Sequence, residues 1–217
     1  PLRALVSKQS EAFRRDFLVT HFFNPPRYMR LLELVVGPET RPEAADEIAA
    51  LCDVRLGKGV VRCHDTPGFI ANRIGTYWLA CAVREAFDAA RRLRAGRRKA
   101  LGLVPGEAAR GLGKLLVVAP DQAEARRYLD VLRAWVPRGQ AETLRLATSD
   151  ERDAHETLAG FRLHPEPSVL VTVAMAYEGL DAPEVAVVAA LTHIRSRPWL
   201  EQMIARATRV DPNAGPY

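Results

Sequence analysis

The stretch FLVTHFFNPPRYMRLLELVV, residues 17–36, decides the first part of the fold. In it, a proline-containing segment separates two apolar runs rich in β-forming residues. The runs are FLVTHFF (17–23) and LLELVV (31–36). Asn24-Pro25-Pro26 must turn the backbone between them, since proline fixes φ and lacks an amide hydrogen. We therefore predict two neighbouring strands. His21 falls at the end of the first strand, and Glu33 lies in the second.

The residues that follow complete a first α/β segment. Pro42 to Cys52 reads as an amphipathic helix, with Thr40 as its expected N-cap. GKGVVRCHD (57–65) is a further short strand that ends at Pro67-Gly68, and a helical pattern then runs from Ile70 to about Leu93.

The second half of the chain alternates strands and helices, which favours a parallel sheet covered on both faces. The predicted strands are LLVVAP (115–120), ETLRLAT (142–148), VLVTVAM (169–175) and VAVVAAL (185–191). The predicted helices are residues 121–135, 150–163 and 198–210. The expected fold class is therefore α/β throughout.

Composition excludes several classes of protein. With 48% hydrophobic and 26% charged residues, the chain of 217 residues does not have the composition of a disordered protein. Its longest apolar runs fall well short of the roughly 20 residues of a membrane helix. We expect a cytoplasmic protein with no membrane partner, since no apolar leader opens the sequence.

The three cysteines, Cys52, Cys63 and Cys81, indicate neither a disulfide framework nor a metal site, because their number is odd and their spacing fits no zinc motif. Cys63-His64-Asp65 suggests a nucleophilic triad. On a strand, however, neighbouring side chains point to opposite faces, so a triad is not expected there.

The net charge of +5 arises in one short segment. Residues 89–114 hold 8 basic side chains and one acidic side chain, whereas the remainder of the chain is nearly balanced. The run RRLRAGRRK (91–99) allows two interpretations. It is a solvated helix end or linker, or it contacts the phosphate backbone of DNA or RNA.

His21 and Glu33 form the first candidate site. A histidine has a suitable pKa to take the proton of an alcohol as its hydride leaves, and a neighbouring carboxylate would fix the ring tautomer. A His and a Glu on adjacent strands are more often an ordinary polar pair, so the two residues alone leave both interpretations open.

The surrounding motifs strengthen the catalytic interpretation. HFFNPP, LLELV and GKGVVRCHDTPGFIANRIG, in this order, resemble the L-3-hydroxyacyl-CoA dehydrogenase family over residues 1–88. The resemblance implies a Rossmann-like segment with an acyl-CoA substrate and NAD as cofactor. It also implies that His21 is the catalytic histidine, that Glu33 is its partner, and that Asn24 and Asn72 lie on the substrate side.

The same resemblance implies a dinucleotide site outside this segment. In that family a glycine-rich βαβ unit precedes the HFFNP motif, and no G-x-G-x-x-G follows a strand anywhere in this sequence. We therefore expect residues 1–88 to be the end of a cofactor domain and the first helix beyond it. We also expect the chain by itself not to oxidise 3-hydroxyacyl-CoA with NAD.

From about Lys114 onward the chain resembles a second family. KLLVVAPDQAEARRYLDVL (114–132), VLVTVAMAYEGLDAPEV (169–185) and EQMIARATRVD (201–211) are similar to the C-terminal motor domain of superfamily-2, DEAD/DEAH-type helicases. The resemblance implies a RecA-like parallel sheet, ATP with Mg²⁺, and a nucleic-acid contact in THIRSRPW (192–199). The residues it implies for nucleotide binding are Gly179 and Asp181 of motif V and Gln202, Arg206 and Arg209 of motif VI.

Three departures from the helicase pattern leave the subfamily and the choice of DNA or RNA open. Val173-Ala174 replaces a common Thr-Asp, and Ala205 and Thr208 stand where glycines are frequent. No G-x-x-x-x-G-K-[ST] phosphate loop occurs in the sequence, so this half is also expected to need a complementary domain.

These expectations divide the chain into a partial dehydrogenase segment (1–88), a basic linker (89–113) and a partial helicase domain (114–217). A recombined or misassembled reading frame explains such a join better than a functional fusion. We name an inactive dehydrogenase fragment first, a helicase fragment second, and a nucleic-acid-binding module built on residues 91–99 third.

Overall fold

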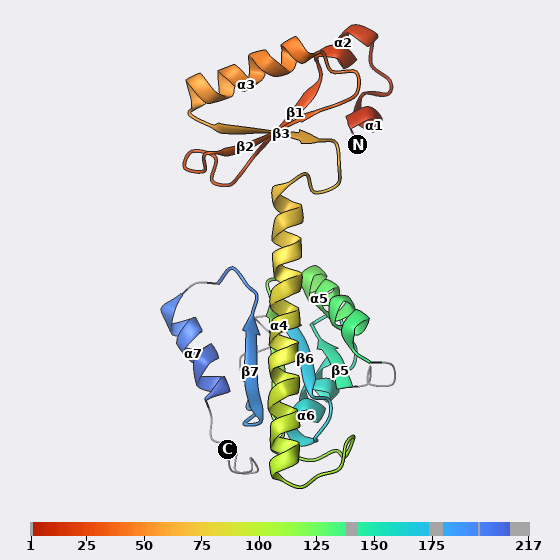
Figure 1. Ribbon diagram of the computed structural model, residues 1–217, viewed down its shortest axis with the longest axis vertical. Coiled ribbons are helices and arrows are strands. Elements are labelled where there is room, and N and C mark those ends of the chain that lie inside the picture. Colours follow the sequence, from red (N-terminus) through yellow and green to blue (C-terminus); the bar gives the residue numbers. More distant parts are fainter. Residues whose placement is uncertain (1, 138–142, 174–179, 195, 209–217) are drawn as a thin grey trace. The chain divides into compact units, whose positions relative to one another are not determined.

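The computed structural model describes residues 2–137, 143–173, 180–194 and 196–208. The chain forms two compact units, residues 1–77 and residues 78–217 (Figure 1). Each unit has its own sheet, and the two sheets share no strand. The mixed α/β class expected from the sequence is confirmed.

The first unit is built on a three-stranded sheet in the order β1-β2-β3. β1 (Leu18–Phe22) is antiparallel to β2 (Leu31–Val36), and β2 is parallel to β3 (Gly59–His64). Helix α3 (Pro42–Leu56) packs on one face through Ala45 and Cys52. The short helices α1 (Leu2–Val6) and α2 (Glu11–Asp16) precede β1, and Leu2 packs on the other face with Val35 and Cys63.

The expected N-cap of α3 is wrong. Arg41, not Thr40, is the N-cap, and it makes no capping bond with its side chain. The Thr40 hydroxyl instead donates to the Phe17 carbonyl (2.7 Å) and accepts from the Gly37 amide (3.0 Å). A threonine near a helix start therefore joins the ends of two paired strands.

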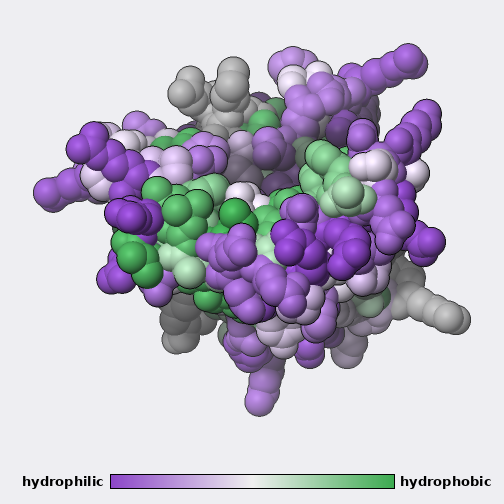
Figure 2. Space-filling model, turned by 90° about the horizontal axis from the view of Figure 1, so that it is seen from above, coloured by the Kyte–Doolittle hydropathy of each residue, from purple (hydrophilic) through white to green (hydrophobic). Residues whose placement is uncertain are grey.

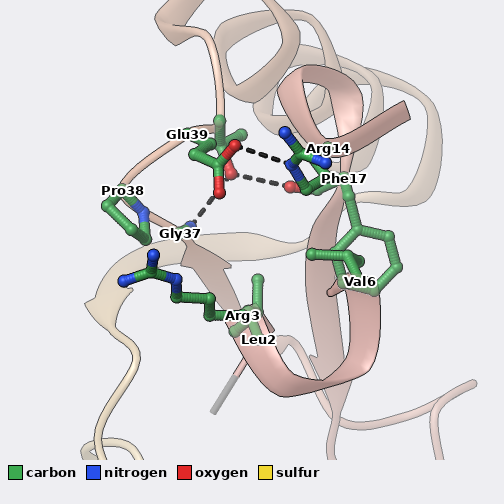
Figure 3. Close-up of a pocket in the computed structure, with 9 residues that line it drawn as sticks. Leu2, Arg3, Val6, Arg14, Phe17, Gly37, Pro38 and Glu39 are labelled. Carbon is green, nitrogen blue, oxygen red and sulfur yellow. Dashed lines mark hydrogen bonds and ion pairs between the residues drawn. The ribbon is translucent and has the colours of Figure 1, made fainter. Parts of the chain in front are cut away.

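A small pocket lies beside this turn, at the end of the β1–β2 pair opposite to His21. Figure 3 shows that Arg14 from α2 reaches across to Glu39 there, with a distance of 2.7 Å between Nε and Oε2. The pocket is lined by Leu2, Arg3, Val6, Arg14, Phe17 and residues 37–40. None of the candidate site residues lines it.

The second unit is built on a four-stranded parallel sheet in the order β5-β6-β4-β7. These strands are β4 (Lys114–Ala119), β5 (Leu144–Ala147), β6 (Val169–Val173) and β7 (Val185–Ala190). The predicted parallel sheet is thereby confirmed. The strands β4, β6 and β7 begin at or within one residue of the starts that the apolar runs indicate.

Helices cover both faces of this sheet. Leu115 and Val117 face α5 (Gln122–Trp135), whereas Leu116 and Val118 face α6 (Ala154–Leu163) and α7 (Arg197–Ala207). This alternation follows from the two-residue period of a strand. Because β4 is buried at every position, the central strand belongs to both cores.

Helix α4 (Ala71–Ala100) is longer than expected. The basic segment 89–113 was expected to be a linker, but residues 89–100 continue the helix. Val83, Phe87 and Ala90 are buried in the core of the second unit together with β4 and α5. Their spacing places them on one helix face. The division between the units therefore falls after Tyr77 and not near residue 88.

Charged contacts hold the later part of α4 in the second unit. Arg94 donates to the Gly113 carbonyl and to the Glu166 carboxylate, both at 2.7 Å. Arg97 is buried and donates to the Gly111 carbonyl at 3.3 Å. Two arginines of the run 91–99 are thus engaged within the protein, which weakens the nucleic-acid interpretation of this segment.

Lys114, at the start of β4, has a fully buried side chain. Its ammonium donates to the carbonyls of Phe161 and His164 and lies 3.8 Å from Glu184, which also pairs with Arg110. Burial lowers the pKa of Lys114 to about 8, although the Glu184 carboxylate opposes this shift. The buried ammonium fastens the start of β4 to the end of α6.

The face shown in Figure 2 is largely hydrophilic, with hydrophobic side chains gathered in parts of it. On α3 the exposed apolar side chains are Leu51, Val54 and Leu56. In the described part of the chain no helix is both long enough and apolar enough to cross a bilayer.

The packing of α4 generates the first prediction. Trypsin should cut first at the exposed end of α4, after Lys99, or in the segment that joins α4 to β4, after Arg110. The two fragments should elute together on gel filtration. Phe87→Ala should weaken their association by about 3 kcal/mol because it removes a buried aromatic ring. The exposed Arg92→Ala is the matched control. Separation of the fragments from the unmodified protein would show that the basic segment is a linker after all.

Candidate functional site

His21 and Glu33 lie directly opposite each other on β1 and β2. Opposed residues of an antiparallel pair point to the same face of the sheet. The His21 Nδ1 atom lies 2.8 Å from Glu33 Oε2. The Glu33 side chain is 1% exposed and that of His21 is 33% exposed. The carboxylate is therefore enclosed, while part of the imidazole ring reaches solvent.

The second Glu33 oxygen binds the start of helix α4. Oε1 accepts hydrogen bonds from the backbone amides of Ile70 (2.9 Å) and Ala71 (2.8 Å). The first amides of a helix have no partner within the helix, and a negative charge at this end is favourable. Glu33 thus serves as the cap that the local sequence does not provide.

These hydrogen bonds fix the charge of the carboxylate. Burial acts to raise the pKa of Glu33, but the Ala71 amide, His21 and the Ile70 amide together hold the pKa below its ordinary value of 4.5. Glu33 is consequently ionised at neutral pH. An ionised carboxylate selects the tautomer with the proton on Nδ1, which leaves Nε2 of His21 as the proton acceptor.

Two phenylalanines flank the imidazole. The ring of Phe23 lies 4.9 Å from that of His21, and the ring of Phe69 lies 5.7 Å away. Phe69 has a φ of 45°, in the left-handed region that bulky residues rarely adopt, and it follows Gly68 at 77°. This turn directs the next two amides toward Glu33.

Cys63 contributes to the surroundings of Glu33 without forming a triad. Burial raises the pKa of the Cys63 thiol, and the Glu33 charge raises it further, so the thiol is neutral. Cys63 is buried and His64 is exposed, in agreement with their expected positions on opposite faces of β3.

The two predicted substrate-side asparagines are both exposed. Asn24 follows the end of β1, and Asn72 lies in the first turn of α4, next to the Ala71 amide that Glu33 binds. The first unit therefore carries both asparagines on segments that adjoin the His21–Glu33 pair in sequence or through a hydrogen bond.

The predicted nucleotide-binding residues belong to the second unit. Arg206, near the end of α7, donates to the Leu180 carbonyl, so the predicted motif VI contacts the predicted motif V. Asp181 and Gln202 are exposed. Gly179 and Arg209 lie outside the described residues.

In the segment 192–199, which was predicted to contact nucleic acid, Arg197 forms an ion pair with Glu201 at 2.7 Å. Arg195 lies outside the described residues.

Sequence reasoning missed the amides of Ile70 and Ala71. A signal was present, because no Ser, Thr, Asp or Asn stands immediately ahead of this helix to cap it. A long helix without a local cap needs an acceptor from elsewhere in the fold.

Known proteins match the first part of the chain. Residues 2–66 match the family model of the 3-hydroxyacyl-CoA dehydrogenase NAD binding domain. A probable 3-hydroxyacyl-CoA dehydrogenase of Deinococcus radiodurans is 43% identical over 84 residues, 39% of this chain and 24% of that protein. Mouse mitochondrial hydroxyacyl-coenzyme A dehydrogenase is 40% identical over 93 residues, 38% of this chain and 29% of that protein.

A putative fatty acid oxidation complex trifunctional enzyme of Rickettsia felis is 43% identical over 88 residues, 41% of this chain and 12% of that protein. The crystal structure of Mycobacterium tuberculosis FadB2 matches at 37% identity and a TM-score of 0.26, over 36% of this chain and 25% of that chain. The chain thus spans 12–29% of the length of these three curated relatives.

The lowered pKa of Glu33 generates the second prediction. The pKa of Glu33 is lower in the folded state than in the unfolded state. Its carboxylate therefore stabilises the fold when the pH is above the unfolded-state pKa, and this stabilisation is lost as the pH falls through the folded-state pKa. Glu33→Gln should therefore lower the free energy of unfolding at pH 7 by about 1.5–3 kcal/mol, and the difference should shrink as pH falls below about 4.5. Urea unfolding of both proteins between pH 7 and pH 3 measures it. The exposed Glu47→Gln is the control. A difference that stays constant over this range would exclude an ionised Glu33.

Proposed function

We propose that the first unit carries the proton-transfer part of an NAD-dependent 3-hydroxyacyl-CoA dehydrogenase of fatty-acid β-oxidation. The observation that carries the proposal is the His21–Glu33 pair. The carboxylate is ionised and enclosed, both of its oxygens are engaged, and the partly exposed histidine has one ring nitrogen left to accept a proton.

His21 would accept the proton of the substrate hydroxyl at Nε2. The resulting imidazolium, protonated at both nitrogens, would be stabilised by the Glu33 carboxylate at 2.8 Å from Nδ1. Glu33 needs no movement for this step because the Ile70 and Ala71 amides already hold it. Asn24 and Asn72 would contact the acyl-CoA substrate.

The described residues do not fit the pyrophosphate of NAD. The only two G-x-G sequences, at Gly57 and at Gly111, do not continue as G-x-G-x-x-G. Gly57 ends α3 with a φ of 62° and leads into a strand, whereas a dinucleotide-binding turn follows a strand and opens a helix. NAD is therefore proposed to be held by residues outside those described.

We extend the proposal to the origin of the chain. The helicase-like motifs of residues 114–217, beside a family match at residues 2–66, support two segments of unrelated ancestry, a dehydrogenase segment and a helicase-like segment, in a chain proposed to be inactive by itself. The seam of ancestry would lie near residues 89–113, beyond the division of the compact units after Tyr77, because the match to the Rickettsia felis protein covers 41% of this chain.

A segment exchange tests the catalytic role of His21. Residues 1–77 replace the corresponding segment of the Deinococcus radiodurans dehydrogenase, and NAD-dependent oxidation of a 3-hydroxyacyl-CoA is measured. The chimera should be active. His21→Gln should lower kcat by about 10²–10⁴-fold, the usual range for a general base.

His64→Gln, an exposed histidine of the same unit, is the matched control and should leave kcat unchanged. A folded chimera whose activity does not depend on His21 would contradict the proposal.

A second candidate function rests on the second unit. The contact between Arg206 and the Leu180 carbonyl supports a helicase C-terminal motor segment, since it joins the predicted motif VI to the backbone next to Asp181. In that role Arg206 and Arg209 would act on ATP bound by another domain.

The helicase proposal predicts no ATP hydrolysis by the purified chain, with or without added DNA or RNA, because the arginines alone do not bind and position the nucleotide. Release of phosphate is the measurement. Hydrolysis that nucleic acid stimulates and that Arg209→Ala abolishes would contradict the need for a separate nucleotide-binding domain.

A further inference from the structure

The loop between β1 and β2 is exposed along its whole length but carries a proposed substrate contact. Residues 24–30 are all exposed, and Asn24 stands at the start of the loop, three residues beyond His21. Within the loop, the amides of Tyr28 and Met29 both donate to the Pro25 carbonyl at 3.1 Å. These local bonds give the loop a turn, but they do not attach it to the rest of the unit.

Lys58 makes that attachment. Its Nζ atom donates to the Pro26 carbonyl and, at 2.8 Å, to the Met29 carbonyl. The same ammonium lies 5.9 Å from the centre of the Phe22 ring, at the end of β1. One side chain therefore holds both arms of the loop and contacts the strand from which the loop leaves.

The burial of Lys58 indicates a specific role. The residue is only 7% exposed, whereas Lys8 and Lys99 are exposed in the usual manner. Taking an ammonium out of water is unfavourable unless hydrogen bonds replace its hydration. Two carbonyls and an aromatic face provide that replacement here.

The backbone around Lys58 fixes where its side chain starts. Gly57 ends α3 in the left-handed region, and the Lys58 amide donates to the Cys52 carbonyl at 3.0 Å. The next residue, Gly59, donates to the Arg30 carbonyl at 2.8 Å. The end of α3 and the end of the loop are thus joined on both sides of Lys58.

We infer that Lys58 is a positioning residue for the substrate-side loop: its buried ammonium holds the Pro26 and Met29 carbonyls and so keeps Asn24 in place beyond His21. The function of the loop rests on the dehydrogenase proposal, whereas its anchoring does not. Lys58 itself is not proposed as a catalytic residue, because protein carbonyls use two of its three donors and only 7% of the residue is exposed.

The first arm of the test measures the anchoring in the full chain. Lys58→Met removes the donors while keeping an unbranched side chain of similar length, and Lys8→Met is the same change at an exposed site. The rate at which an arginine-specific protease cleaves after Arg27 and Arg30 measures how mobile the loop is. The loss of a lysine removes no cleavage site of this protease. Cleavage in Lys58→Met should be about tenfold faster or more than in the control, as expected for the loss of hydrogen bonds from a charged donor.

The second arm measures what the anchoring does for the substrate. Acetoacetyl-CoA, a 3-ketoacyl-CoA, is titrated into each protein by calorimetry. Lys58→Met should bind it about tenfold more weakly than the control if an ordered loop presents Asn24. The imidazole NMR signals of His21 in the free protein should be unchanged, since the Glu33 contact does not involve the loop.

Lys58→Gln keeps two donors without the charge and should give intermediate cleavage and binding. If circular dichroism shows that Lys58→Met is unfolded, Lys58→Gln replaces it in both measurements. Equal protection of the loop in Lys58→Met and the control would overturn the inference. Faster cleavage with unchanged acetoacetyl-CoA affinity would also overturn it, because Lys58 would then only fasten the loop. Failure of the unmodified chain to bind acetoacetyl-CoA would count against the dehydrogenase proposal, and the protease arm would still decide the anchoring.

Discussion

The buried carboxylate of Glu33 is the constraint on which the first unit depends. A negative charge taken out of water needs several donors to compensate for its lost hydration. Glu33 obtains them from three residues: His21 on β1, through its imidazole, and Ile70 and Ala71 at the start of α4, through their amides. The strand pairing that orients the histidine and the turn that opens the long helix are therefore parts of one network, and Phe69 accepts an unusual backbone conformation within it.

The second unit obeys a different constraint, the burial of both faces of one central strand. β4 has helices on both sides, and its first residue, Lys114, fastens the amino end of the strand through a buried ammonium. Near this end, Arg94 of α4 pairs with Glu166 in the segment that precedes β6. The basic composition of residues 89–114 is thus partly explained by internal ion pairs.

Sequence alone predicted most of the strands and placed His21 and Glu33 on neighbouring strands, because a proline break separates two apolar runs. That the two residues are partners was implied by the family resemblance. It did not predict the end of α4. The cluster of arginines and Gly96 reads locally as a linker. The burial of Phe87 and Ala90 and the contacts of Arg94 and Arg97 with distant residues hold the helix in the second unit there. It also missed the bonds from Ile70 and Ala71 to Glu33 and from Lys58 to the loop. These bonds use backbone groups, which every residue type possesses. The lack of a capping residue ahead of α4 indicates that an acceptor is needed there, but it does not identify Glu33.

The double engagement of Glu33 has an evolutionary consequence. A residue that serves only catalysis drifts once selection for the reaction ends, whereas a residue that also supports the fold is retained. Because Glu33 caps α4 as well as contacting His21, its loss would destabilise the unit in an active and in an inactive descendant alike. In relatives that no longer catalyse the reaction, the glutamate should therefore be retained longer than the histidine. Substitution of the histidine would be the earlier sign of lost activity.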